Sequence, residues 1–302
     1  IFGSGFGLLL ASFLVKKMKD FSNFGTITEY LETRYNSKFL RSASAFLSMV
    51  ALIALVGSQV GAAVGIMNAL GMKNTTIAAL FACIVIIALT SMGGLMAVTV
   101  TDGFQIILVM VGVVWITVAA LGDIGGLSGL NASLTAIQSE LPEGYNVFMD
   151  SEKFKSLLWM ILPGLMYIMI GQDIYQRLFA CKDHKTAIKA SVCSAVLVCI
   201  VSVMPVTLGL IARVKHPELA TAGTSAAAFA TIAMSTLPGW AVGIIIAAAL
   251  SAIFSTADSC LSAAASHFMT DLYLPYIGKN VDTKDRRLVT ISRAFTVIAG
   301  LA

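Results

Sequence analysis

Long apolar stretches separated by short polar connections dominate the chain. A helix needs roughly 20 apolar residues to cross a bilayer, and most of these stretches reach or exceed that length. The pattern predicts an all-α polytopic membrane protein whose residues 1–302 form one transmembrane domain of about eight segments. The predicted segments are about 1–15, 39–71, 75–96, 98–121, 155–180, 187–212, 238–270 and 287–302.

Composition supports a membrane protein. Of the 302 residues, 58% are hydrophobic and 12% are charged, whereas soluble proteins carry about 25% charged residues. The net charge of +4 does not indicate nucleic-acid binding, because the basic residues lie in short connections. The five cysteines have no metal-ligand spacing and are interpreted as packing residues.

The two ends of the chain have an unusual feature. The first and last apolar stretches are shorter than a full span, and there is no initiator Met. We therefore expect the sequence to be the interior of a longer protein.

Lys and Arg concentrate in alternate connections, which sets an expected orientation. The first connection carries Lys16 and Lys17, and the one before segment 187–212 carries Lys182 and Lys185. Because basic loops stay in the cytoplasm, both connections are predicted to be cytoplasmic. The linkers 122–154 and 213–237 are then external.

Segment 238–270 places an aspartate and several hydroxyls within an apolar stretch. Ser251, Ser255, Ser259, Ser262 and Ser266 recur at helical spacing and predict one polar stripe. Small hydroxyl residues also favour helix packing in membranes, which suffices for Ser262 and Ser266.

Packing does not account for Asp258 in the same segment. An intramembrane carboxylate is costly and usually marks an ion or proton pathway. With Ser255 and Ser259 facing the same point, Asp258 would complete a set of hard oxygen ligands for Na⁺ or a proton site.

Two other segments carry candidate chemistry. Asp102 lies near the start of segment 98–121 and shares a face with Gln105; it is an ion-site candidate, or alternatively a helix cap near Gly93 and Gly94.

In segment 155–180, Pro163 and Gly164 predict a helix break of the kind that forms transporter sites. Gln172, Asp173 and Tyr175 follow this point. Arg177 and Lys182 are interpreted as interfacial anchors.

Four stretches together resemble the sodium/solute symporter family, which includes sodium/proline, sodium/glucose, sialic acid and choline cotransporters. They are "TITEYLETRYNS" (26–37), "GGLMAVTVTDGFQ" (93–105), "GQDIYQRLFACKD" (171–183) and "FSTADSCLSAAASHFMTDLY" (254–273). The resemblance covers essentially the whole chain. It implies a LeuT-like fold of two inverted five-helix repeats, here core helices two to nine without the first and last.

The repeats implied by the resemblance pair particular segments. Segment 1–15 should match 187–212, 39–71 should match 238–270, and 75–96 should match 287–302.

The resemblance also implies site residues. The main sodium site would use the Ala252 carbonyl and the Ser255 and Thr256 hydroxyls. A second sodium or proton site would use Asp102, Ser255, Asp258 and Ser259. Some members have serine where Asp258 stands, so Asp258 could bind sodium, take a proton or tune the neighbouring site.

Substrate contacts are likewise carried over by the resemblance. They would come from Gln172 and Asp173, with Gln59 a weaker candidate.

The implied function is sodium-coupled import of a small polar organic solute by alternating access, not an enzymatic one, in a bacterial cytoplasmic membrane. A proton-coupled symporter of the same fold is the main alternative. A channel would need a pore loop or charge ring. An intramembrane protease would need GxGD, or GxSG with a histidine on the same side; "GLSG" at 126–129 and His267 are predicted on opposite sides.

Overall fold

The computed structural model describes residues 2–18, 24–92, 95–137, 151–220, 225–278 and 285–301, and these residues contain helices but no strand. The main helices are α1 (Phe2–Lys17), α2 (Ile27–Tyr35), α3 (Lys38–Ala69), α4 (Thr75–Met92), α5 (Leu95–Asp123), α6 (Gly126–Ala136), α7 (Ser151–Ile170), α8 (Gln172–Phe179), α9 (His184–Val201), α10 (Val203–Lys215), α11 (Ala228–Thr236), α12 (Gly239–His267) and α14 (Arg286–Leu301). Short turns η3 (Pro217–Ala220) and η4 (Ser225–Ala227) precede α11. A π-helix, η5 (Phe268–Tyr273), and a short α13 (Leu274–Tyr276) continue α12.

Each apolar segment of the sequence contains at least one helix. Among the described residues, four helical stretches are long and apolar enough to cross a membrane: Lys38–Ala69, Asp102–Asp123, His184–Lys215 and Gly239–Tyr276. A fifth candidate is the bent pair Phe154–Ile168 and Gln172–Phe179, while α4 is a shorter apolar helix. The helices therefore fit a polytopic membrane protein.

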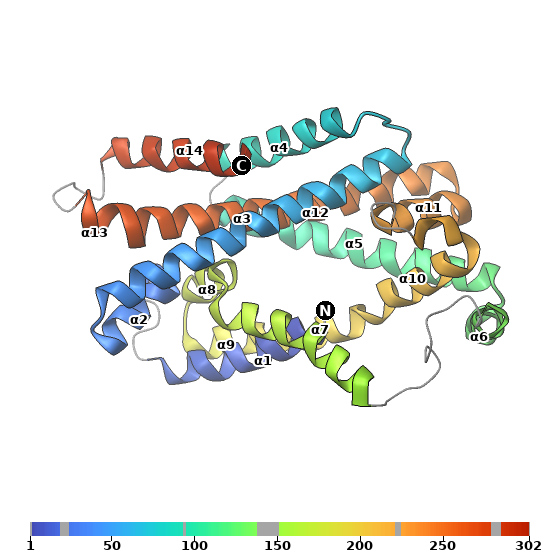
Figure 1. Cartoon of the computed structure of the whole chain (residues 1–302), viewed down its shortest axis with the longest axis horizontal. Coiled ribbons are helices and arrows are strands. Elements are labelled where there is room, and N and C mark those ends of the chain that lie inside the picture. The colour runs from blue at the N-terminus through green and yellow to red at the C-terminus, as the bar shows by residue number, and fades with distance from the viewer. Residues whose placement is uncertain are drawn as a thin grey trace.

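The helices that the inverted repeat predicts as mates lie against each other. The pairs α1 with α9, α3 with α12 and α4 with α14 are all in contact. The contacts between these pairs are also symmetric. Each of the long helices α3 and α12 contacts both α4 and α14. In Figure 1 the long helices α3 and α12 run through the centre, with α4 and α14 along one side and α1, α7 and α9 along the other.

Several buried apolar clusters hold this arrangement. Leu52 and Val56 of α3, Ile86 of α4 and Leu261 of α12 belong to one buried cluster. A second cluster joins α1, α7, α8 and α9 and includes the fully buried Tyr175. Tyr167 of α7 packs against both clusters, so burial of apolar area also holds the two groups of helices together.

Glycines let α1 approach its neighbours closely. An added Cβ at Gly3 would collide with the Ile161 carbonyl oxygen of α7, and one at Gly5 would lie 2.6 Å from the Cys199 sulfur of α9. Small residues at helix contacts are the usual way for membrane helices to pack tightly. α1 is therefore wedged between α7 and α9.

The break in segment 155–180 lies later than the sequence predicted. Pro163 is inside the continuous helix α7, so the prediction of a break at Pro163 and Gly164 is wrong. The chain instead leaves the helical conformation at Gly171, where ψ is 109°, and α8 starts at the next residue. The Gly171 amide still donates to the Tyr167 carbonyl over 2.6 Å. The two helices meet at 41°.

Replacing Gly171 by alanine is expected to displace α8. The new Cβ would lie 2.9 Å from both the Tyr167 carbonyl oxygen and Asp173 Oδ1, so the turn has no room for it. Overpacking of this kind costs about 1–3 kcal/mol. Thermal unfolding of the purified protein should show the loss. Gly209→Ala is the matched control, because nothing lies within 4 Å of its Cβ position; equal stability of the two variants would contradict the prediction.

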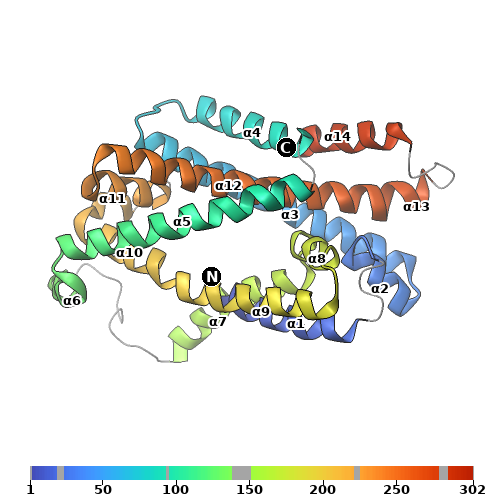
Figure 2. The same cartoon turned by 180° about the vertical axis from the view of Figure 1, so that it is seen from behind.

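The two ends of the bundle differ in their elements. α2, α8 and α13 lie at one end, and α6 and α11 lie at the other, in both Figure 1 and its reverse view, Figure 2. The first of these ends carries Lys16, Lys17 and Arg34. At the same end Asp183 caps α9 by accepting from the Thr186 amide over 2.7 Å, which lowers the pKa of its carboxyl group.

Candidate ion and solute site

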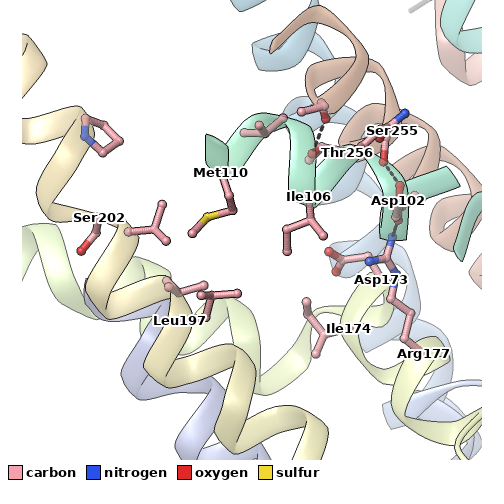
Figure 3. A pocket seen from close by; sticks show the side chains of 17 residues that line it. Asp102, Ile106, Met110, Asp173, Ile174, Arg177, Leu197, Ser202, Ser255 and Thr256 are labelled. Atoms are coloured by element: carbon pink, nitrogen blue, oxygen red, sulfur yellow. Dashed lines mark hydrogen bonds and ion pairs between the residues drawn. The ribbon is translucent and has the colours of Figure 1, made fainter. Parts of the chain in front are cut away.

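A cavity of about 520 Å³ opens between α5, α8, the α9–α10 pair and α12. Its wall is formed by Asp102, Gln105, Ile106, Val109, Met110, Asp173, Ile174, Arg177, Leu197, Val198, Val201, Ser202, Pro205, Ala252, Ser255, Thr256 and Ser259. Segments predicted as separate site contributors therefore meet around one space. Figure 3 shows the polar side chains from α5, α8 and α12 gathered at one end, opposite the apolar side chains of α5 and α9.

Asp102 is the centre of the polar end. The helix α5 begins at Leu95, so Asp102 lies inside it and the alternative role as a helix cap is wrong. The Ser255 hydroxyl of α12 donates to Asp102 Oδ1. A carboxylate from α5 and a hydroxyl from α12 thus meet at the cavity wall.

Thr256 and Ala252 supply two more oxygens one helical turn apart. The Thr256 hydroxyl donates to the Ala252 carbonyl oxygen over 2.9 Å, and the Thr256 side chain is exposed to the cavity. Ser255 lies beside them on the same wall. The three residues predicted for the main sodium site are therefore brought together.

Arg177, which the sequence predicted to be an interfacial anchor, lines the cavity and pairs with Asp102. Its Nη2 atom donates to Asp102 Oδ2 over 2.9 Å and to the Ser259 hydroxyl over 2.5 Å. The guanidinium bridges α8 to α5 and α12 (Figure 3). Arg177 lies one turn after Asp173 in α8, so both side chains reach the same cavity wall.

Asp173 lines the cavity from the first turn of α8. The Tyr167 hydroxyl of α7 donates to Asp173 Oδ1 over 2.6 Å, across the break at Gly171. This bond fixes the carboxylate with respect to α7. Tyr167 was not anticipated, because only the break brings a side chain six residues upstream back to Asp173.

Asp258 does not share the point at which Ser255 and Ser259 meet. It is 5% exposed, forms no part of the cavity wall and lies beside Thr90 of α4. An α-helix turns about 100° per residue, so Asp258 is rotated away from Ser259 toward α4. The prediction that all three face one point is wrong for Asp258.

Gln172 and Gln59 are also outside the cavity wall. Gln172 is fully buried, and its amide donates to the Gly25 carbonyl over 2.8 Å and accepts from the Ile27 amide over 3.0 Å. Gln59 lies half-buried on α3. In this structure neither side chain lines this cavity, and the carry-over of substrate contacts to Gln172 and Gln59 stays a prediction.

The serine stripe of α12 passes from one cavity to another. Ser251 accepts from the Gln105 amide over 2.6 Å, and Ser255 and Ser259 line the first cavity. Ser262 and Ser266 instead line a second cavity of about 510 Å³ beside α4 and α14. Only the first half of the stripe therefore faces the candidate site.

Comparisons with known proteins show which family the chain resembles. The model of the sodium:solute symporter family matches residues 2–302. The chain is 29% identical to a sodium/glucose cotransporter of Vibrio parahaemolyticus over 91% of this chain and 54% of that protein. It is also 29% identical to a sodium/pantothenate symporter of Haemophilus influenzae, over 84% of this chain and 52% of that protein. The chain thus spans about half the length of the curated relatives it matches.

A solved structure has the same fold. A Na⁺-coupled sialic acid symporter in a substrate-bound outward-open state superposes with a TM-score of 0.74 at 19% identity, covering 99% of this chain and 66% of the other. The predicted LeuT-like inverted-repeat fold is confirmed. Since the family model extends over nearly every residue, the chain belongs to the sodium:solute symporter family.

Proposed function

We propose that the protein couples the entry of Na⁺ to the import of a small polar organic solute by alternating access. The observation that carries this proposal is the cluster of Asp102, Ser255, Thr256 and Ser259 at one end of the cavity. Oxygen ligands of this kind suit a hard cation. Family membership and the sodium-coupled relatives support the same function.

The main sodium site would use the Ala252 carbonyl and the Ser255 and Thr256 hydroxyls. The fit is supported by geometry, because the Ala252 and Thr256 oxygens are 2.9 Å apart and both belong to the cavity wall. Binding of the ion would replace part of its hydration shell with these oxygens. The Asp102 carboxylate, held by Ser255, adds negative charge beside them.

The second cation site would use Asp102, Ser255 and Ser259. In this structure the Arg177 guanidinium contacts Asp102 and Ser259, and its positive charge balances the Asp102 carboxylate. A sodium ion there requires the guanidinium to leave, and Arg177, whose side chain is 44% exposed, has solvent into which to move. Asp258 would then tune the site from the side of α4 and not ligate the ion.

The solute would bind in the same cavity. Its volume is within the range of small-molecule sites, about 300–1,000 Å³. Asp173 and Arg177 at one end would bind polar groups, and Ile106, Met110 and Leu197 would cover an apolar part. This favours a solute with a polar head and an apolar body, imported across a bilayer that we propose to be a bacterial cytoplasmic membrane.

Uptake under ion substitution tests the proposal. The whole protein, reconstituted in vesicles, is given labelled glucose, pantothenate, proline and sialic acid in sodium or in potassium medium, each with and without an inward proton gradient. Accumulation of one solute that needs sodium and not the proton gradient is expected. Accumulation driven by the proton gradient in potassium medium would instead support the proton-coupled alternative, for which Asp102 and Asp258 are the candidate carriers.

A further inference from the structure

Asp271, in η5, is a fully buried carboxylate outside the proposed ion and solute site. Its Oδ1 atom accepts from Thr26 over 2.9 Å and from Arg41 Nε over 2.7 Å. Its Oδ2 atom accepts from Thr28 over 2.7 Å and lies 2.8 Å from His267 Nδ1. Four groups from three separate parts of the chain therefore converge on one charge.

The cluster is tied to both long central helices. Arg41, near the start of α3, also donates to the Thr270 carbonyl over 3.0 Å and to Glu32 of α2 over 2.6 Å. His267 of α12 contacts Ser48 of α3 through Nε2 over 3.0 Å. Asp271 thus fixes the start of α2 to the α3–α12 pair with charge-assisted bonds.

Residues 25–28, which we call the strap, bind two different parts of the protein, with successive residues bonded to one part and then to the other. Thr26 and Thr28 bind Asp271 through their hydroxyls. Gly25 and Ile27 bind the fully buried Gln172 amide through their backbone oxygen and nitrogen. Since Gln172 is the first residue of α8, the strap joins α8 on one side to η5 on the other. Figure 1 shows α2, α8 and α13 together at one end of the bundle.

The strap acts on the helix that carries the site. Gln172 precedes Asp173, which lines the cavity, and Arg177 lies in the same two-turn helix. Tyr167 holds Asp173 from the α7 side, and Arg177 reaches Ser259 of α12. The position of the first turn of α8 therefore determines where both charged groups meet the cavity.

We infer that Asp271 is a positioning residue for the ion and solute site: through the strap and Gln172 it holds α8 against α12 and keeps the cavity closed toward the end that carries α2. This inference rests on the proposed function. Opening at that end requires the strap to release one attachment. The Gln172 bonds join neutral groups, whereas the Asp271 bonds are charge-assisted and stronger. The strap therefore stays with α12 and parts from α8.

Three substitutions test the strap in the whole protein. Gln172→Leu removes both bonds to the strap, Thr28→Val removes one donor to Asp271, and Thr28→Ser restores a hydroxyl. Thr33→Val is the matched control, because this exposed hydroxyl of α2 bonds only its own helix, at the Glu29 carbonyl. Each is placed in a background without native cysteines that carries Leu197→Cys on the cavity wall.

The readout is the rate at which an impermeant maleimide, applied from the side that carries α2, modifies this cysteine in the monodisperse fraction of each variant. Gln172→Leu should raise the rate about fivefold or more, from the loss of two neutral hydrogen bonds. Thr28→Val should raise it less, and Thr28→Ser and Thr33→Val should match the parent. Equal rates in Gln172→Leu and the parent would overturn the inference.

Uptake separates positioning from general stability. Gln172→Leu should raise the sodium concentration at half-maximal uptake, while a purely structural role would lower only the amount of active protein and the maximal rate. The two proposals can fail separately. If the parent shows no sodium-dependent uptake, the proposed function is wrong, but the labelling rates still test whether the strap holds α8 in place. An increase in labelling with an unchanged sodium requirement would overturn the link to the ion site.

Discussion

Removing the Thr256 hydroxyl should raise the sodium concentration needed for half-maximal uptake by about 5- to 150-fold, the equivalent of about 1–3 kcal/mol for an unsatisfied polar site. Thr256→Ala takes away one oxygen ligand and leaves the Ala252 carbonyl without its 2.9 Å partner. Ser255→Ala should do at least as much, because Ser255 also binds Asp102. Since coupling between two ligands is reciprocal, apparent solute affinity should fall at low sodium and recover at high sodium.

The matched control for Thr256→Ala is Thr135→Ala on α6. Thr135 makes the same bond to a carbonyl four residues earlier, at Asn131 over 2.8 Å, but on an exposed face. Initial uptake rates over a sodium series measure all three variants. If Thr256→Ala and Ser255→Ala keep the half-saturating sodium of the parent, the two hydroxyls are packing groups only and the ion binds elsewhere.

Replacing Asp102 by asparagine should lower maximal uptake more than it shifts sodium affinity. The change removes the charge that faces Arg177 across 2.9 Å, and it should reduce the number of ions coupled. We expect maximal uptake to fall about tenfold or more. This is at the low end of the range for breaking a charge pair, because Arg177 is partly exposed. The Hill coefficient for sodium and the maximal rate, measured together, check both parts.

A double substitution shows why Asp102→Asn fails. If the unpaired guanidinium causes the loss, the double variant Asp102→Asn, Arg177→Gln should be more active than Asp102→Asn alone. The effects of two substitutions at residues in contact need not add. If the missing carboxylate is what matters, the double variant should stay inactive. Asp123→Asn is the control, since Asp123 pairs with Lys215 over 3.2 Å outside the cavity. A parent-like maximal rate and Hill coefficient in Asp102→Asn would contradict the assignment.

Much of the fold could be read from the sequence because membrane helices leave a strong signal. Apolar length located the long helices, and the four family-like stretches predicted the inverted repeat that pairs α3 with α12. Helical spacing also placed Ser255 and Ser259 on one face, where the structure has them. These properties depend on local periodicity, which a single sequence contains.

The errors concern how helices are rotated and where they break. Proline suggested a break at Pro163, but a membrane helix can absorb a proline, and the turn occurs at Gly171. The sequence predicts an anchor at Arg177 because its partner, Asp102, is 75 positions away in the chain. Asp258 was placed with Ser259 although one residue of rotation directs it to α4. The break, the partner of Arg177 and the direction of Asp258 all depend on contacts between distant segments. Periodicity in the sequence does not determine such contacts.

The π-helix after α12 implies a low tolerance of insertions and deletions between His267 and Tyr276. A π turn holds one residue more than an α turn, and η5 contains Asp271 and leads directly to Tyr276, whose hydroxyl lies 2.8 Å from Ser42 of α3. Deleting one residue there would convert the π turn into an α turn and change the direction in which Asp271 faces its partners. Homologous chains should therefore keep a fixed count of residues between His267 and Tyr276.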